Sequence, residues 1–81
     1  MSHETYQPIA CSQYDLYEIA IMRGQLVDLI WSDEQGVEQQ ARVKPVGLQT
    51  HDGQEFLLIL RDPEKKDVIA SVRLDRIRFM K

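Results

Sequence analysis

From Gln25 onwards the chain alternates apolar and polar residues in short runs that are separated by turn-forming residues. Alternation with a period of two is typical of β-strands, in which successive side chains point to opposite faces of a sheet. The predicted strands are Gln25–Trp31, Val37–Val46, Phe56–Leu60, Val68–Leu74 and a short last strand with Ile77 and Phe79 facing inward. We expect Phe56–Leu60 to be the central strand, because it is apolar on both faces.

Turn signals join these strands. Ser32–Gly36 and Thr50–Gly53 are predicted to be hairpin turns, because Asp and Gly tolerate the backbone angles that tight turns need. Asp62–Asp67 is predicted to be an exposed loop that keeps Lys65 and Lys66 in solvent. Pro45 lacks a backbone N–H, so we expect the second strand to end, to bend or to become an edge there.

One helix precedes the strands. Tyr14, Tyr17 and Ile21 recur at the spacing of one apolar helical face, which Ala20 extends. Ser12 is predicted to be the N-cap, with Asp15 near the positive end of the helix dipole. Arg23 and Gly24 are typical of a helix C-terminus, so the helix should span about 13–23. Residues 1–12 are predicted to form an extended arm that Tyr6 and Ile9 attach to the domain.

The predicted fold class is therefore α+β and mainly β: an N-terminal helix followed by a five-stranded, strongly bent antiparallel barrel. Five bent strands without a covering layer must hide both edges of their sheet, which favours a barrel. The helix-first order favours an Sm-like barrel over an oligonucleotide-binding barrel. We expect a single domain over 1–81, with the barrel at about 25–80.

Motifs of catalysis are missing from the sequence. It has no glycine-rich phosphate loop, no pair of cysteines and no His-x-x-x-His spacing. We therefore expect no enzymatic activity, no catalytic residues, no cofactor and no metal. Cys11 is the only cysteine, which fits a reducing cytoplasm, and we expect neither a signal peptide nor a membrane span.

Charge is unevenly distributed along the chain. The net charge is −3, but residues 1–41 hold seven acidic residues against Arg23 alone, whereas residues 42–81 hold nine bases against six acids. Asp15 and Glu18 share one flank of the helix, which is either a solvated face or an acidic docking surface for a basic partner. The C-terminal bases allow a different hypothesis, a small RNA-binding module that uses Arg42, Lys44, Arg73, Arg76 and Arg78. A third hypothesis is a structural subunit that self-associates through a strand edge.

The N-terminal residues resemble the signature of the Rho-binding antiterminator family, also called Rof or YaeO. The similar positions are Thr5–Ile9 (TYQPI), Cys11, Tyr14, Asp15, Glu18 and Ala20, and further along Leu74–Ile77 (LDRI). The resemblance covers most of the chain, and it implies an Sm-like barrel in a bacterial cytoplasmic protein. Where some relatives have acidic or polar residues, this chain has Ser12, Gln13 and Leu16.

A function and a partner follow from the resemblance. It implies a protein that binds the N-terminal RNA-binding domain of the termination factor Rho, occludes its primary RNA site and so inhibits Rho-dependent termination. Tyr14, Asp15 and Glu18 would be the Rho-binding residues, with the carboxylates set against basic groups of Rho. The resemblance implies neither catalysis nor direct nucleic-acid binding, and the charge of the helix agrees with such a partner.

Overall fold

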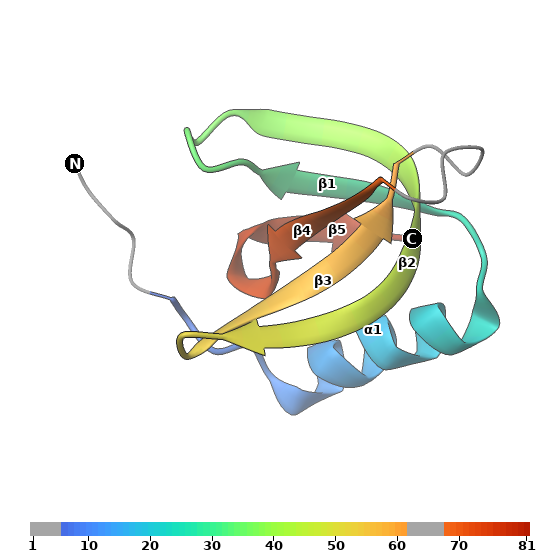
Figure 1. Cartoon of the computed structure of the whole chain (residues 1–81), viewed down its shortest axis with the longest axis horizontal. Helices are drawn as coiled ribbons and strands as arrows, with labels where there is room; N and C mark the ends of the chain where they lie inside the picture. The colour runs from blue at the N-terminus through green and yellow to red at the C-terminus, as the bar shows by residue number, and fades with distance from the viewer. Residues whose placement is uncertain (1–5, 62–67) are drawn as a thin grey trace.

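One helix followed by five antiparallel strands makes up residues 6–61 and 68–81, the part of the chain that this computed structural model describes (Figure 1). The elements are α1 (Cys11–Arg23), β1 (Val27–Ser32), β2 (Glu38–His51), β3 (Gln54–Leu60), β4 (Ile69–Arg73), the 3₁₀ turn η1 (Leu74–Arg76) and β5 (Ile77–Met80). The predicted fold class, with its helix-first order, is confirmed. The predicted loop Asp62–Asp67 lies outside the described residues.

The helix α1 begins at Cys11, two residues before the predicted start, and its N-cap is Ala10 rather than Ser12. The carbonyl of Ala10 accepts hydrogen bonds from the N–H groups of Gln13 and Tyr14 at 3.0 and 3.1 Å. No side chain caps this end, and no acidic residue lies in the first turn. The prediction of a Ser12 cap was wrong because the arm, attached to the core through Ile9, sets where the chain turns into the helix.

The end of α1 matches the prediction. Gly24 adopts a left-handed conformation with φ of 62°, and its N–H donates to the carbonyls of Ala20 and Ile21 at 3.2 and 3.1 Å. Glycine adopts this conformation without the steric cost that a Cβ atom brings. Arg23 lies in the last turn, where a cation interacts favourably with the helix dipole.

The strand order in the sheet is β4-β3-β2-β1-β5, so β2 is the central strand. The prediction that Phe56–Leu60 is central was wrong: β3 lies between β4 and β2, and the fourteen-residue β2 is long enough to join β3 to β1. Its first half pairs with β1 and its second half with β3. Figure 1 shows β2 curving around one side of the molecule between these partners.

Pro45 lies at the bend of β2 and does not end the strand. It is fully buried, and the register with β3 shifts between Pro45 and Gly47. A bulge tolerates proline because it interrupts the hydrogen-bonded ladder, to which proline has no N–H to donate. Of the predicted outcomes at Pro45, bending is therefore the one observed.

The core lies inside the bent sheet and under α1. Its buried residues are Tyr17, Leu29, Trp31, Val43, Leu57, Ile59, Val72 and Leu74. Phe79 was predicted to face inward, but it is 46% exposed, and Met80 packs against the core in its place. The register between β1 and β5 shifts between Ile30 and Trp31, which changes the face that the end of β5 presents. Val68, where the fourth strand was predicted to start, precedes β4 and is exposed.

The described part of the arm is attached as predicted. The Tyr6 hydroxyl donates a hydrogen bond to Glu55 at 3.0 Å, and the Gln7 N–H donates to Asp75 at 2.9 Å. Burial and the hydrogen bond with Glu55 raise the pKa of Tyr6 to about 12. Ile9 packs against the core. These contacts join the arm to β3 and η1, so they position the start of α1 relative to the sheet.

Two chain reversals follow the predicted chemistry. Asp52 and Gly53 have φ of 51° and 73° at the turn between β2 and β3, as a two-residue hairpin requires. The chain between β4 and β5 bends through η1, which contains Asp75 and Arg76.

Candidate protein-binding surface on the helix

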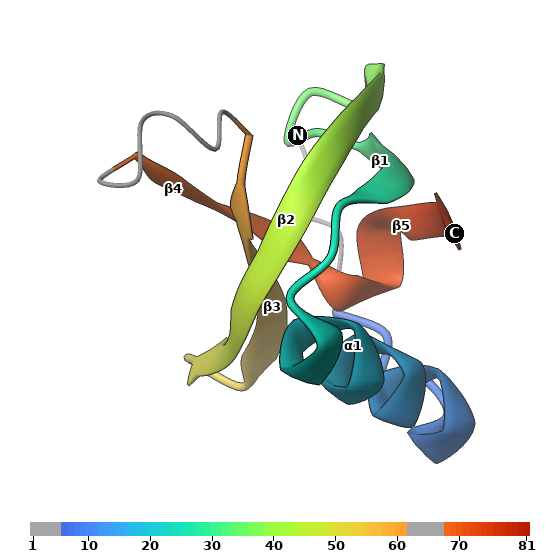
Figure 2. The same ribbon diagram turned by 90° about the vertical axis from the view of Figure 1, so that its right-hand side faces the viewer.

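The rotation of α1 about its axis is set by the side chains that it buries. Tyr17 is 6% exposed and belongs to the core, and Tyr14 and Ile21 are half-buried against it. The sheet element that α1 contacts most is β2 (Figure 2). The apolar spacing that was read from the sequence therefore marks the inward face of the helix.

The outward face of α1 carries the two predicted carboxylates. Asp15 and Glu18 are both exposed, and neither has a hydrogen bond or an ion pair with any residue of the described ranges 6–61 and 68–81. Tyr14, the third predicted site residue, is half-buried and borders this face. Two negative charges that pair with no cation of these ranges can interact with a basic partner.

The same face also carries exposed apolar side chains that the sequence analysis did not assign to it. Leu16 is 57% exposed, Ile19 is 42% exposed and Met22 is 85% exposed. All three lie off the helical face that Tyr14 and Tyr17 define. That position in the helical repeat was the signal in the sequence that pointed to their exposure. Large exposed apolar residues beside charged ones are typical of protein interaction sites.

Two pockets adjoin these apolar residues, between α1, β1 and β5. One has a volume of ≈ 220 Å³ and is lined by Gln13, Leu16, Tyr17, Ile77, Arg78, Phe79 and Met80. The other has a volume of ≈ 240 Å³ and is lined by Leu16, Ile19, Ala20, Arg23, Gln25, Leu26, Val27, Met80 and Lys81. Leu16 and Met80 line both pockets, so the apolar surface continues from α1 towards β5. We call Asp15, Leu16, Glu18, Ile19 and Met22 the helix surface.

The bases of the RNA-binding hypothesis do not form one exposed surface. Arg73 has a side chain only 9% exposed, and its Nη2 lies 2.6 Å from a carboxylate oxygen of Asp75. The guanidinium also lies over the Tyr6 ring, 5.6 Å from its centroid. Arg42 is exposed, 3.9 Å from Asp28, and Arg76 is half-buried. Arg73, one of the bases of that hypothesis, is therefore not an exposed contact for nucleic acid.

Within 6–61 and 68–81, no group of three His, Cys, Asp or Glu side chains is placed to hold a metal ion. In the same residues, no helix has the length and apolar character needed to cross a membrane. Cys11 is a free, exposed cysteine.

Comparison with known proteins gives a fold. No model of a protein family matches the chain, and no curated protein matches it. Among solved structures, the chain is similar to proteasome accessory factor B/C (PafBC) of Arthrobacter aurescens, with a TM-score of 0.71 and 22% sequence identity. The match covers 93% of this chain and 12% of that protein. At this identity the similarity shows a shared fold, one helix followed by a five-stranded antiparallel sheet.

Proposed function

We propose that this protein inhibits Rho-dependent transcription termination by binding the N-terminal RNA-binding domain of Rho and occluding its primary RNA site. The observation that carries the proposal is the pair Asp15 and Glu18, exposed on α1 without a partner among the described residues. The resemblance of the N-terminal residues to the Rho-binding antiterminators supplies the identity of the partner. The activity requires no catalytic step, and it belongs to the bacterial cytoplasm.

Electrostatics supports occlusion as the mechanism. A protein site that holds RNA presents basic groups to phosphates, and carboxylates on a rigid helix can pair with the same groups. The two carboxylates lie three residues apart on α1, so the helix fixes their separation. Tyr14 borders them and would contact the same partner. Charge pairing of this kind raises the association rate and fixes the register of docking.

The apolar part of the helix surface supports a complex that persists after encounter. Leu16, Ile19 and Met22 would lose water on docking, which is the favourable term that carries most association energy. Exposed ion pairs alone contribute little, about 0–1 kcal/mol each. The acidic pair would therefore select and orient Rho, and the apolar residues would hold it.

The test is a titration of this protein into Rho that carries a fluorescent oligocytidine, at two salt concentrations. The wild-type protein is expected to release the oligonucleotide without binding it. The double variant Asp15→Lys with Glu18→Lys is expected to lose this effect while keeping its fold, because both side chains are exposed.

A matched control separates local from global charge. The double variant Glu34→Lys with Glu38→Lys changes the net charge by the same amount at two exposed positions outside α1. It is expected to displace the oligonucleotide as the wild-type protein does. Equal loss of displacement in both double variants, or no loss in either, would contradict the assignment to α1.

The RNA-binding hypothesis gives a different result in the same experiment. A small Sm-like RNA-binding module would itself bind the free oligonucleotide, with an affinity that falls steeply as salt rises. Arg42 and Lys44 are the bases of that hypothesis on one strand, and Arg42→Gln would then weaken binding. Displacement from Rho without binding to the free oligonucleotide distinguishes occlusion from this alternative.

A further inference from the structure

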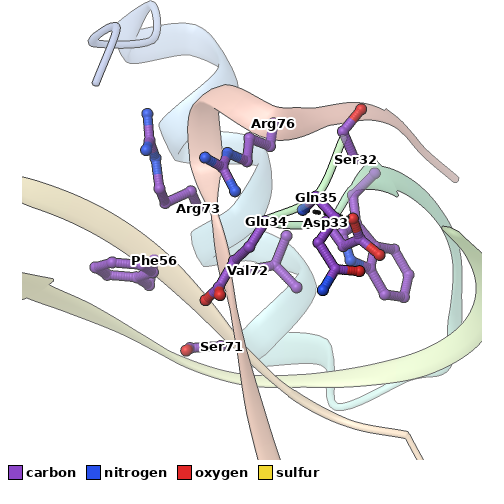
Figure 3. Close-up of a pocket in the computed structure, with 10 residues that line it drawn as sticks. Ser32, Asp33, Glu34, Gln35, Phe56, Ser71, Val72, Arg73 and Arg76 are labelled. Carbon is purple, nitrogen blue, oxygen red and sulfur yellow. Dashed lines mark hydrogen bonds between the residues drawn. The ribbon is translucent and has the colours of Figure 1, made fainter. Parts of the chain in front are cut away.

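A second pocket region lies away from the helix surface, between the β1–β2 turn and the β4–η1 segment (Figure 3). Its volume is ≈ 310 Å³, and it is lined by Trp31, Ser32, Asp33, Glu34, Gln35, Phe56, Ser71, Val72, Arg73 and Arg76. None of these residues belongs to α1. We call it the arginine pocket.

Arg76 is the unusual residue of this pocket. It is half-buried, and its Nε is fully buried without a hydrogen-bond partner in the described chain. A guanidinium group has five N–H donors and keeps its charge at all ordinary pH values. Partial burial of such a group without pairing is costly, so native proteins normally satisfy it. No ion pair of Arg76 occurs within residues 6–61 and 68–81.

Asp33 is near Arg76 but is already engaged by its own turn. One carboxylate oxygen accepts hydrogen bonds from the N–H groups of Gln35 and Val37, both at 2.9 Å, and the other accepts from the Gln39 amide at 2.9 Å. The Val37 N–H is the main cause that lowers the pKa of Asp33, and the charge of Arg76 adds to it. Asp33 therefore holds the turn in shape rather than pairing with Arg76.

Asp75 is the second nearby acid, and it is engaged as well. It binds the guanidinium of Arg73 through Nε at 3.0 Å and Nη2 at 2.6 Å, and it accepts the Gln7 N–H. Burial raises the pKa of Asp75, but these hydrogen bonds and the charges of Arg73 and Arg76 outweigh burial, so the pKa is lowered. Neither of these carboxylates pairs with Arg76, and within the described residues no ion pair joins Arg76 to Glu34, which also lines the pocket. The guanidinium of Arg76 therefore remains available to another anion.

The remaining walls favour an aromatic group. Trp31 and Val72 are buried in the core, and the guanidinium of Arg61 lies over the Trp31 ring, so Trp31 offers little surface to a ligand. Phe56 is half-buried and pairs with Arg73, on the face of the β3–β4 sheet that points away from Val72. Figure 3 shows Arg73 and Arg76 on one side of the pocket, with Phe56 and Ser71 lying across from Arg76. Aromatic rings pack well against such side chains in offset or edge-to-face arrangements. Glu34 also lines the pocket, and its negative charge disfavours a ligand with several anionic groups.

We propose that the arginine pocket binds a small aromatic anion, whose carboxylate or phosphate group pairs with Arg76 and whose ring packs against Phe56. Arginine matches the geometry of both anionic groups through paired N–H donors. A volume of ≈ 310 Å³ is at the lower end of the range for ligand pockets, which suits a single-ring compound.

The test is a titration of the full chain, followed by ¹H–¹⁵N NMR, with phenyl phosphate, benzoate, inorganic phosphate and phenol. We expect saturable shifts at Phe56, Ser71 and Arg76 with phenyl phosphate or benzoate. Inorganic phosphate and phenol each lack one half of the ligand. Each is therefore expected to bind at least about tenfold more weakly than the aromatic anion. Whichever of phenyl phosphate and benzoate binds more tightly shows whether the pocket prefers a phosphate or a carboxylate group.

Variants decide whether Arg76 and the pocket are responsible. Arg76→Gln is expected to weaken binding by about tenfold or more. Ser71→Phe, at an exposed position of β4, fills the pocket with Arg76 intact and is expected to block binding. Arg42→Gln removes an exposed guanidinium outside the pocket and is expected to change nothing.

Several outcomes would overturn the proposal. These are no saturable binding of either aromatic anion, unchanged binding in Arg76→Gln and Ser71→Phe, or shifts confined to α1. If Arg76→Gln does not fold, as its NMR spectrum would show, Ser71→Phe decides the question by itself. Rho is not present in this experiment, so its result is independent of the proposed function.

Discussion

Arg73 and Asp75 form an ion pair that lies almost entirely out of solvent, with side chains 9% and 8% exposed. The pair also determines the path of the arm, since Asp75 accepts the Gln7 N–H and Arg73 lies over the Tyr6 ring. Removing one partner of a buried ion pair leaves an uncompensated charge, which costs more than an exposed pair can contribute. These residues therefore stabilise the fold and the arm rather than serving as a nucleic-acid surface.

Asp75→Asn tests this role at the residue scale. The variant is expected to lose about 3 kcal/mol of unfolding free energy at neutral pH, because Arg73 loses its anionic partner. The pKa of Asp75 is lowered in the folded protein, so its stabilisation is present above the unfolded-state pKa and is lost as pH falls below about 4. Urea unfolding at pH 7 and at acidic pH measures both effects.

The control for this prediction is Asp52→Asn, which removes an exposed carboxylate at a turn position that asparagine tolerates. It is expected to change the unfolding free energy by less than about 0.5 kcal/mol. An acid branch of the stability curve that is the same for Asp75→Asn and the wild-type protein would contradict the role of Asp75.

At the scale of elements, local chemistry sets one end of α1 and tertiary contacts set the other. The C-terminus depends on Gly24, whose left-handed conformation allows its N–H to reach two carbonyls of the last turn. The N-terminus of α1 has no side-chain cap, and the helix starts after Ala10, where the attached arm positions the chain. β2 is likewise shaped by its partners, since it changes from β1 to β3 around Pro45.

Gly24→Ala is therefore expected to destabilise the protein by about 1–2 kcal/mol. The cost comes from the positive φ, because a Cβ at this position would meet no atom closer than 3.9 Å. Ser12→Ala is the matched comparison and should cost well under the loss of about 1 kcal/mol that follows removal of an N-cap. Thermal or urea unfolding of both variants makes the measurement, and a larger loss in Ser12→Ala would show that Ser12 caps the helix after all.

At the scale of the whole molecule, the fold combines side chains from several elements into each surface. The apolar part of the helix surface continues into pockets that β1 and β5 complete. The arginine pocket combines the β1–β2 turn with β3, β4 and η1. The proposed Rho contact and the proposed anion site are therefore built on different parts of one small domain.

Leu16→Ser with Ile19→Ser tests the apolar contribution to Rho binding. Both side chains are exposed, so the unfolding free energy should change little, whereas displacement of oligocytidine from Rho should need about tenfold more protein. Unlike the loss in the Asp15 and Glu18 variant, this loss should persist at high salt, because salt screens charge but not apolar contact. Val37→Ser, an exposed apolar residue outside the helix, is the control, and an equal effect there would contradict a specific apolar contact.

The acidic part of the candidate site could be predicted from the sequence. The exposure of Asp15 and Glu18 followed from their place off the Tyr14–Tyr17 face, since helical periodicity alone decides which residues share a side. The sequence did not settle whether Leu16 and Ile19 are exposed, because apolar side chains off one helical face can still be covered by another part of the protein. Only the position of α1 on the sheet shows how much of its circumference is covered.

The sequence by itself determined the helix, its glycine C-terminus, the Asp52–Gly53 hairpin and the number and order of the strands. These features depend on local backbone chemistry and on side-chain periodicity. Only the tertiary structure decided that β2 is central, that Phe79 is exposed and that Arg73 is buried while Arg76 has no ion-pair partner among the described residues. Strand pairing, bulges and ion pairs join residues far apart in the chain, and their energies depend on separations that no local pattern encodes.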